Sequence, residues 1–450
     1  MHMPGRRTRA EQGCCRSRDH ANRRTLLSAG LGLAGGLASG WLTPLAEILA
    51  QDHESADRGH QARSVIVLWM EGGPSQLETF DPHPGRLIAA GSRAIKTSVP
   101  GVQVSAQLPR MAERMDKLAL VRSMVSKEGD HERATSYIKN GFRPQPTVVY
   151  PSLGSVICHQ LRDEVEIPRH ISILPSNWPA RSGFLGAQYD AFQIGDPQHP
   201  VPDVHAQVPP ARAARRLSDL ADVVEEEFAR GRFRQLDQKK TLHLASIRQA
   251  ERMMSSSQLE AFDIGRVSRA ERQRFGETPF GRGCLAAARL VEVGVRCVEV
   301  TLRGWDTHIN NHEKHGELNA VLDMAMSALV DRLDEKNLLQ HTVVLWGGEF
   351  GRTPEVNSLD GRDHWPHGFT IALAGGGIRG GQVVGETSPD PDLKARDLTV
   401  NVDSPQTINS IHATVLHALG VNPGVVVYTP EGRPITLNKA MPIKQLLAGT

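Results

Sequence analysis

The chain has 450 residues, of which 39% are apolar and 23% are charged, with 52 Lys and Arg against 50 Asp and Glu. This composition excludes a disordered polymer, a collagen-like repeat and a small disulfide-rich protein. The net charge of +2 and the aromatic content of 5% argue against a nucleic-acid partner, which needs a basic or base-stacking surface.

The first fifty residues have the pattern of an export signal. Arg23 and Arg24 are followed directly by a mildly apolar stretch, residues 26–42, that is rich in Gly and Ala. Such a pair before such a stretch is typical of a twin-arginine translocation (Tat) signal. The alternative is a transmembrane anchor, but the stretch is short for a span of about 20 residues.

We therefore expect a leader at residues 1–50 and an exported protein at residues 51–450, in the periplasm or outside the cell. The tripeptide at 48–50 is a poor cleavage site, so an uncleaved leader that tethers the protein to the membrane stays open.

Downstream of the leader, short β-branched runs alternate with helical patterns. Strands are expected at residues 64–69, 118–121, 170–174, 297–302, 342–346 and 370–374. Helices are expected at residues 108–115, 132–140, 280–293, 318–337 and 407–419, with a charged helical insertion at about 205–278. Because strands that alternate with helices form parallel sheets covered on both faces, we predict a three-layer α/β fold with a largely parallel central sheet.

Polar side chains gather after several of these strands. They are Glu71 and Ser75 after the first strand, Asp306, His308 and His312 after the strand at 297–302, Glu349 and Arg352 after the strand at 342–346, and His364 and His367 in the next loop. Because the carboxyl ends of parallel strands share one edge of a sheet, where ligands bind, we expect these groups to converge.

Imidazole and carboxylate together suit divalent zinc, manganese or iron, whereas a set of oxygens suits magnesium or calcium. The candidate metal ligands are Glu71, Asp306, His308, His312, Glu349, His364 and His367. Two metals would stabilise the attacking and leaving oxygens of a phosphate or sulfate ester. Arg352 would hold the oxyanion through paired hydrogen bonds.

Each candidate also has a structural explanation. Asp306 can cap a turn, Ser75 can cap a helix after a glycine turn, and Asp130 with His131 can form the start of a helix. Glu349 points more clearly to function, because an unpaired carboxylate directly after a buried strand costs several kcal/mol.

Eight motifs extend over much of the chain. They are EGGPSQLETFDPHPG (71–85), DHERATSYIKNG (130–141), YPSLGSV (150–156), FGRGCLAAARLVEVGVRCVEV (280–300), GWDTH (304–308), GGEFGRTP (347–354), GRDHWPHGF (361–369) and GGGIRGGQVVGET (375–387). Together they resemble a large bacterial family of Tat-exported proteins, a domain of unknown function (DUF) related to the alkaline phosphatase and sulfatase superfamily.

The resemblance implies an alkaline phosphatase-like fold with metals at the sheet edge. It places the first-strand acid of the superfamily at Glu71, a later acid at Glu349, a metal-binding set at 306–312 and the last histidine at His364 or His367. At the position of the nucleophile this chain has His131 instead of Ser, Thr or Cys, and the Cys-x-Pro-Ser-Arg sequence of formylglycine sulfatases is absent. The options are metal-activated water, another nucleophile such as Ser75, or no catalysis.

The sequence thus predicts an exported hydrolase of phosphate or sulfate esters with one or two divalent metals, zinc or manganese ahead of calcium or magnesium. Its candidate catalytic residues are His131, Ser75 and Arg352. A small-molecule or polysaccharide ester would be the substrate, the Tat translocase would be the partner during export, and only an uncleaved leader would reach a membrane. The alternative is a non-catalytic binding or scaffold protein that retains the fold, so whether the chain is an enzyme stays open.

Overall fold

The computed structural model describes residues 62–161, 165–202 and 250–449, with scattered residues between 204 and 223. The predicted leader and much of the predicted helical insertion lie outside the described residues, and both stay predictions. No helix in the described ranges combines the length and the apolar character needed to cross a bilayer.

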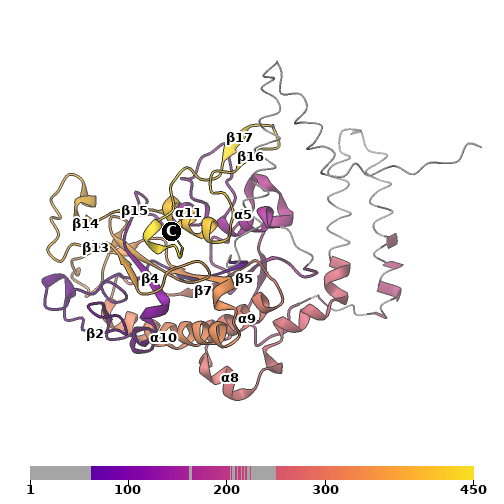
Figure 1. Cartoon of the computed structure of the whole chain (residues 1–450), viewed down its shortest axis with the longest axis horizontal. Coiled ribbons are helices and arrows are strands. Elements are labelled where there is room, and N and C mark those ends of the chain that lie inside the picture. The colour runs from indigo at the N-terminus through magenta and orange to yellow at the C-terminus, as the bar shows by residue number, and fades with distance from the viewer. Residues whose placement is uncertain are drawn as a thin grey trace, which may run out of the picture. The chain divides into compact units, whose positions relative to one another are not determined.

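A nine-stranded sheet lies at the centre of the described part of the chain (Figure 1). Its strands, in spatial order, are β12 (Gln382–Val384), β4 (Leu118–Val125), β11 (Phe369–Gly375), β8 (Thr342–Gly347), β1 (Ser64–Glu71), β7 (Cys297–Arg303), β5 (His170–Ile173) and β6 (Phe192–Ile194), with β15 (Gln406–Thr407) also paired to β4. Strand β11 runs antiparallel to both of its neighbours, and the other pairings in this sheet are parallel. The predicted largely parallel sheet is therefore confirmed, with β11 as its exception.

Two hydrophobic cores lie on opposite faces of the sheet. Ile66 and Leu68 of β1 belong to the core that includes helices α3 (Pro109–Glu113), α9 (Pro279–Glu292) and α10 (Asn311–Glu335). Val65 and Trp69 of the same strand belong to the core that includes α4 (His131–Asn140), α5 (Leu153–Gln160) and α11 (Ile408–Ala418). Successive residues of a strand face opposite sides, so one continuous apolar strand supplies both cores.

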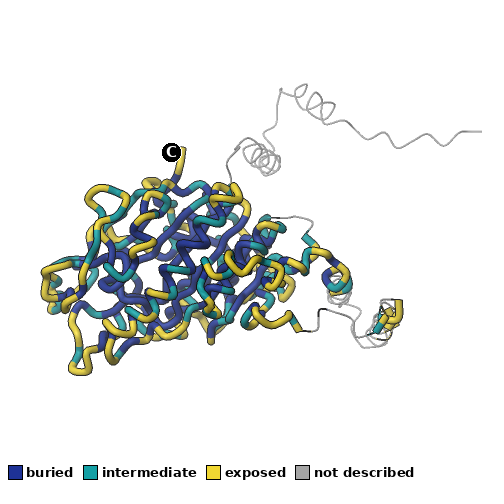
Figure 2. Tube along the Cα trace, turned by 90° about the horizontal axis from the view of Figure 1, so that it is seen from below, coloured by how far each residue is buried: buried dark blue, intermediate teal, exposed yellow. Residues whose placement is uncertain are grey.

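The three layers follow from this division. Figure 1 shows α9 and α10 on one side of the sheet and α5 and α11 on the other, and Figure 2 shows the buried residues running through the middle of the described part of the chain. The predicted three-layer α/β arrangement is confirmed.

Two helix ends matter for the site. Helix α4 ends at Asn140 and is capped by Gly141, whose left-handed φ of 74° suits a glycine. Helix α10 begins at Asn311 rather than at the predicted residue 318, because its first turns are polar and carry no apolar periodicity. His312 and His315 therefore lie on a helix and not in a loop.

Candidate metal centre

The carboxyl ends of three neighbouring strands bring the site together. Strand β1 pairs in register with β7 and β8, so the loops after these strands start side by side. The loop after β8 continues into β9 (Gly351–Arg352), which pairs with β10 (His364–Trp365) and places His364 opposite Arg352. Helix α4 supplies His131 as its first residue, directly after its cap Asp130.

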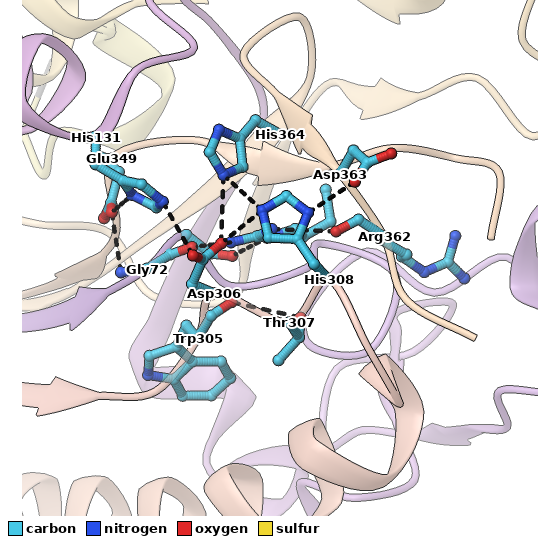
Figure 3. Close-up of polar contacts among 12 residues, drawn as sticks. Gly72, His131, Trp305, Asp306, Thr307, His308, Glu349, Arg362, Asp363 and His364 are labelled. Atoms are coloured by element: carbon cyan, nitrogen blue, oxygen red, sulfur yellow. Dashed lines mark hydrogen bonds and ion pairs between the residues drawn. The ribbon is translucent and has the colours of Figure 1, made fainter. Parts of the chain in front are cut away.

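Three imidazoles surround the carboxylate of Asp306 (Figure 3). From Oδ1 of Asp306, Nε2 of His308 lies at 3.0 Å and Nε2 of His364 at 3.3 Å. Nε2 of His131 lies 3.4 Å from Oδ2. The Nε2 atoms of His308 and His364 are 3.0 Å apart, and ligand atoms of His131, Asp306 and His364 lie within 4.8 Å of one another. The structure thus gathers donors from three separate parts of the chain around one point.

The other nitrogen of each ring is held by an acceptor. Each Nδ1 lies 2.7 Å from its partner, which is Glu349 Oε1 for His131, Asp363 Oδ1 for His308 and the carbonyl oxygen of Gly129 for His364. These contacts assign an N–H to Nδ1 and turn Nε2 of each ring toward Asp306. Proteins orient metal-binding histidines in this way, with a carboxylate or carbonyl behind the ring.

The charges of the cluster favour a cation at its centre. Burial alone would raise the pKa of Asp306, but hydrogen bonds from His131, His364 and Arg352 outweigh it and hold that pKa well below its usual range. Hydrogen bonds to Asp306 and Glu349 raise the pKa of His131 to about 9. Near neutral pH the cluster therefore holds a proton on His131 that a bound metal ion would replace.

Glu349 lies behind His131. It is fully buried, and its Oε1 accepts from the backbone N–H of Gly72 at 2.9 Å as well as from His131. Its Oε2 is buried and has no hydrogen-bond partner among the described residues. Gly72 has a φ of +117°, and a Cβ on it would lie 2.3 Å from the backbone nitrogen of Asp306, so only glycine fits this turn.

Arg352 is fully buried and its donors are used within the protein. It donates to the carbonyl oxygens of Gly72, Gly73 and Arg362 and to Oδ1 of Asp306, the last at 2.7 Å. Four of the five guanidinium N–H groups are used in this way, and the side chain is fully buried, so it is not presented to a substrate oxyanion. The geometry instead gives Arg352 the role of holding Asp306 and the turn after β1, which corrects the role predicted from the sequence.

Ser75 and Glu71 belong to different networks. Ser75 is fully buried, its hydroxyl donates to Glu78, and its backbone N–H donates to Nε2 of His315 at 2.8 Å. A hydroxyl used in this way is not presented to a substrate, so Ser75 does not fit the predicted role of a nucleophile. Glu71 accepts from the N–H of Asn177 at 2.8 Å and pairs with Nε of Arg303 at 3.1 Å.

His312 and His367 also contact other groups. Nδ1 of His312 lies 3.3 Å from the hydroxyl of Ser92. The ring of His367 packs edge-on against Trp365, and burial lowers its pKa. Both were predicted as metal ligands, and the structure places neither beside Asp306 in the group that can hold a metal.

Two residues of this region were missed by sequence reasoning. Asp363 was included only in the motif at 361–369 and not among the candidates, although its Oδ1 orients the ring of His308. His315 gave no signal, because a histidine in a polar helical turn is typical of an exposed surface, yet it is fully buried under the loop after β1.

Residues 62–447 match the family described as a protein of unknown function (DUF1501). The chain therefore belongs to the DUF1501 family, and the family membership inferred from the motifs is confirmed. A search of curated proteins gave no match.

Several solved structures are similar to this chain at low identity. One is a protein of the alkaline phosphatase superfamily from Vibrio parahaemolyticus, at 11% identity and a TM-score of 0.34, covering 80% of this chain and 67% of that one. A second is the PsFucS1 sulfatase from Pseudoalteromonas sp., at 13% identity and a TM-score of 0.37, covering 83% of this chain and 70% of that one. A third is the C-terminal periplasmic domain of EcEptC from Escherichia coli in complex with Zn, at 10% identity and a TM-score of 0.37, covering 86% of this chain and 96% of that one. Because all three TM-scores are below 0.5, these similarities say nothing about the chemistry of the site. That chemistry is inferred from the residues of this chain alone.

Proposed function

We propose that this protein is an exported, metal-dependent hydrolase of phosphate or sulfate esters. One observation carries the proposal: three histidines, each fixed through Nδ1, direct their Nε2 atoms at the carboxylate of Asp306.

The donor set suits a transition metal. Three neutral imidazoles and one carboxylate are typical ligands of zinc, and they also suit manganese or iron. The residues that would hold the ion are His131, His308, His364 and Asp306. The side chain of Asp306 is 47% exposed, so the centre is accessible to water and to a substrate. A bound divalent ion would polarise the ester and activate water for attack.

One observation supports a second metal ion beside Glu349. Oε2 of Glu349 is buried and has no hydrogen-bond partner in the part of the chain that the structure describes, although an unpaired buried carboxylate oxygen is costly. A cation beside this atom would remove that cost. We therefore include Glu349 as a ligand in a two-metal version of the site.

Water is the nucleophile that the residues favour. Position 131 carries an imidazole that is fixed between two carboxylates, and the hydroxyl of Ser75 is used by Glu78. Neither is free to attack an ester. We propose hydrolysis by direct attack of water, without a covalent enzyme intermediate.

The substrate and the location are part of the same proposal. We propose a small-molecule or polysaccharide ester as substrate and export of the protein by the Tat translocase to the periplasm or the exterior. The competing function is a non-catalytic binding or scaffold protein, favoured by the missing hydroxyl or thiol at position 131.

The test combines metal analysis with an ester screen. Protein purified without chelator should contain at least one equivalent of a transition metal and should hydrolyse a member of a phosphate- and sulfate-ester panel. His308→Ala and Glu349→Ala should abolish turnover while circular dichroism shows an intact fold. His367→Ala is the control, because it removes a histidine that is close to His364 in the chain but lies outside the cluster, and it should keep activity.

Three results would contradict the proposal. A fully folded protein that binds no metal would remove its basis. Turnover that survives both His308→Ala and Glu349→Ala would show that the site has been assigned to the wrong residues. Tight metal binding with no turnover on the whole panel would favour the non-catalytic alternative.

A further inference from the structure

The loop after β5 places an aromatic ring beside the candidate metal centre. The indole of Trp178 is parallel to the imidazole of His131, with the ring planes 6° apart and the centroids separated by 6.3 Å. Trp178 is only partly buried. The indole therefore contributes surface next to a residue that would bind the metal.

One side of this loop is held by an ion pair at the strand ends. The backbone N–H of Asn177 donates to Oε1 of Glu71 at 2.8 Å. Oε2 of Glu71 pairs with Nε of Arg303 at 3.1 Å, and the Arg303 guanidinium also donates to the carbonyl oxygen of Pro175. Because Glu71 and Arg303 are register partners on β1 and β7, the loop is tied to the sheet itself.

The other side is held by a buried lysine. Nζ of Lys139 lies 2.8 Å from Oε1 of Glu299, and the two side chains are 6% and 5% exposed. The same ammonium donates to the hydroxyl of Ser176 at 3.0 Å and to the carbonyl oxygen of Trp178 at 3.1 Å. All three donors of the ammonium are thus used, as a buried charge requires, and two of them fix the loop.

The backbone at the start of the loop is strained. Leu174 has a φ of +53° and directly precedes Pro175. A left-handed conformation is rare for leucine, and the residue before a proline favours an extended one. Such a conformation persists only where the surrounding contacts dictate it, and such positions concentrate at functional sites. The contacts on both sides therefore restrain the backbone of this loop to one conformation.

We propose that Trp178 is a specificity-determining residue, a rigid stacking surface for a flat ring on the substrate, next to the anionic group bound at the metal. Aromatic faces bind flat ring systems by stacking, and the backbone that carries this indole is held in place. The inference rests on the proposed function, because the metal would anchor the anionic group. It adds that the preferred substrates are esters in which a ring lies close to the phosphate or sulfate.

The test compares two anions that cannot be hydrolysed, phenylphosphonate and methylphosphonate, by calorimetric titration of the metal-loaded protein. The wild type should bind phenylphosphonate about tenfold more tightly, as expected for one stacking contact. Trp178→Ala should remove this preference and leave the affinity for methylphosphonate and the metal content unchanged. Trp178→Phe, which restores a smaller ring, should keep most of the preference.

Tyr428→Ala is the matched control, because Tyr428 is a 67% exposed aromatic residue on strand β16 (Val426–Tyr428), and it should keep the full preference. Equal affinities of the wild type for the two phosphonates would overturn the inference. So would an equal loss of both affinities in Trp178→Ala, since the indole would then only support the centre.

The two proposals can fail separately. A preference for phenylphosphonate that depends on Trp178, together with no turnover of any ester, would sustain this inference and refute the hydrolase. Turnover by a protein without that preference would refute only this inference. Metal-loaded protein that binds neither phosphonate would refute the stacking surface together with the anion site on which it depends.

Discussion

The backbone N–H of Ser75 donates to Nε2 of His315 at 2.8 Å, and Nδ1 of His315 donates to the carbonyl oxygen of Asn311 at 2.9 Å. Helix α10 thus holds the loop after β1, and the loop in turn donates to Glu349 through Gly72. Because Nε2 of His315 has to accept a hydrogen bond, this ring must stay neutral in the folded protein.

This requirement predicts a loss of stability at mildly acidic pH. Burial lowers the pKa of His315 to about 4 and also lowers that of His412 to about 4. The ordinary value of about 6.5 applies to the unfolded chain, which therefore takes up protons first as the pH falls. The stabilising contribution is complete above pH 6.5 and is lost between about pH 6.5 and 4, by roughly 3 kcal/mol per histidine. Urea unfolding at a series of pH values measures this loss.

The control for this prediction is a change of the histidine itself. His315→Gln, whose amide can still accept from Ser75, should remove about half of the pH dependence and leave the part that His412 contributes, whereas His199→Gln, at an exposed position, should leave it as in the wild type. An unchanged slope in His315→Gln would show that His315 does not titrate on unfolding.

Asp363 should act on metal binding through His308. Asp363→Asn weakens the acceptor that fixes Nδ1 of His308, and we expect the metal affinity to fall about 10- to 100-fold, as is typical when such a partner is removed. Competition with a chelator of known affinity measures the change. Asp360→Asn, an exposed aspartate of the same loop whose φ of 54° suits asparagine, is the control and should bind metal normally. Wild-type affinity in Asp363→Asn would contradict the assignment of His308.

Glu71 should hold the loop after β5 rather than a metal. Glu71→Gln keeps an acceptor for the N–H of Asn177 but loses the ion pair with Arg303. We expect faster hydrogen exchange at residues 176–178, because one of the loop's attachments is weakened, and an unchanged number of bound metal ions. Loss of one metal equivalent would show that Glu71 is a ligand after all, as the family resemblance implies.

Gly72 should tolerate no side chain. Gly72→Ala adds a Cβ within 2.3 Å of the backbone of Asp306 at a left-handed φ, and we expect destabilisation of about 3–4 kcal/mol together with weaker metal binding. Gly85→Ala is a matched control: its φ is +79°, but the added Cβ would meet no described atom within 4 Å. It should cost only the backbone strain, about 1–2 kcal/mol. Similar losses in both variants, measured by urea unfolding, would contradict the close approach at Gly72.

Much of the fold could be predicted because the strands are buried on both faces. The run at 64–71 is apolar nearly throughout, and such runs followed by glycine or polar turns are easy to find in a sequence. The direction of β11 could not be predicted, because apolar runs look the same in parallel and antiparallel strands. The start of α10 was missed because residues 311–317 are polar and show no apolar periodicity.

The site was predicted in outline, for a related reason. The shared strand edge correctly brings Asp306, Glu349 and His364 close together, because that follows from topology alone. Which atoms face each other depends on backbone turns that residue spacing does not encode. The sequence gives no sign that Arg303 engages Glu71, or that Arg352 uses its donors on the carbonyl oxygens of the turn after β1.

The donors of the cluster lie far apart along the chain, and His131 and the Glu349 that orients it are separated by 218 positions. An unfolded polypeptide cannot assemble them, so any ion that binds there binds only the native form and stabilises it by mass action. The resistance of this protein to heat and proteases would then vary with the supply of that ion in its surroundings. When the metal is scarce, less of the protein is stabilised by bound ion, and its lifetime becomes shorter.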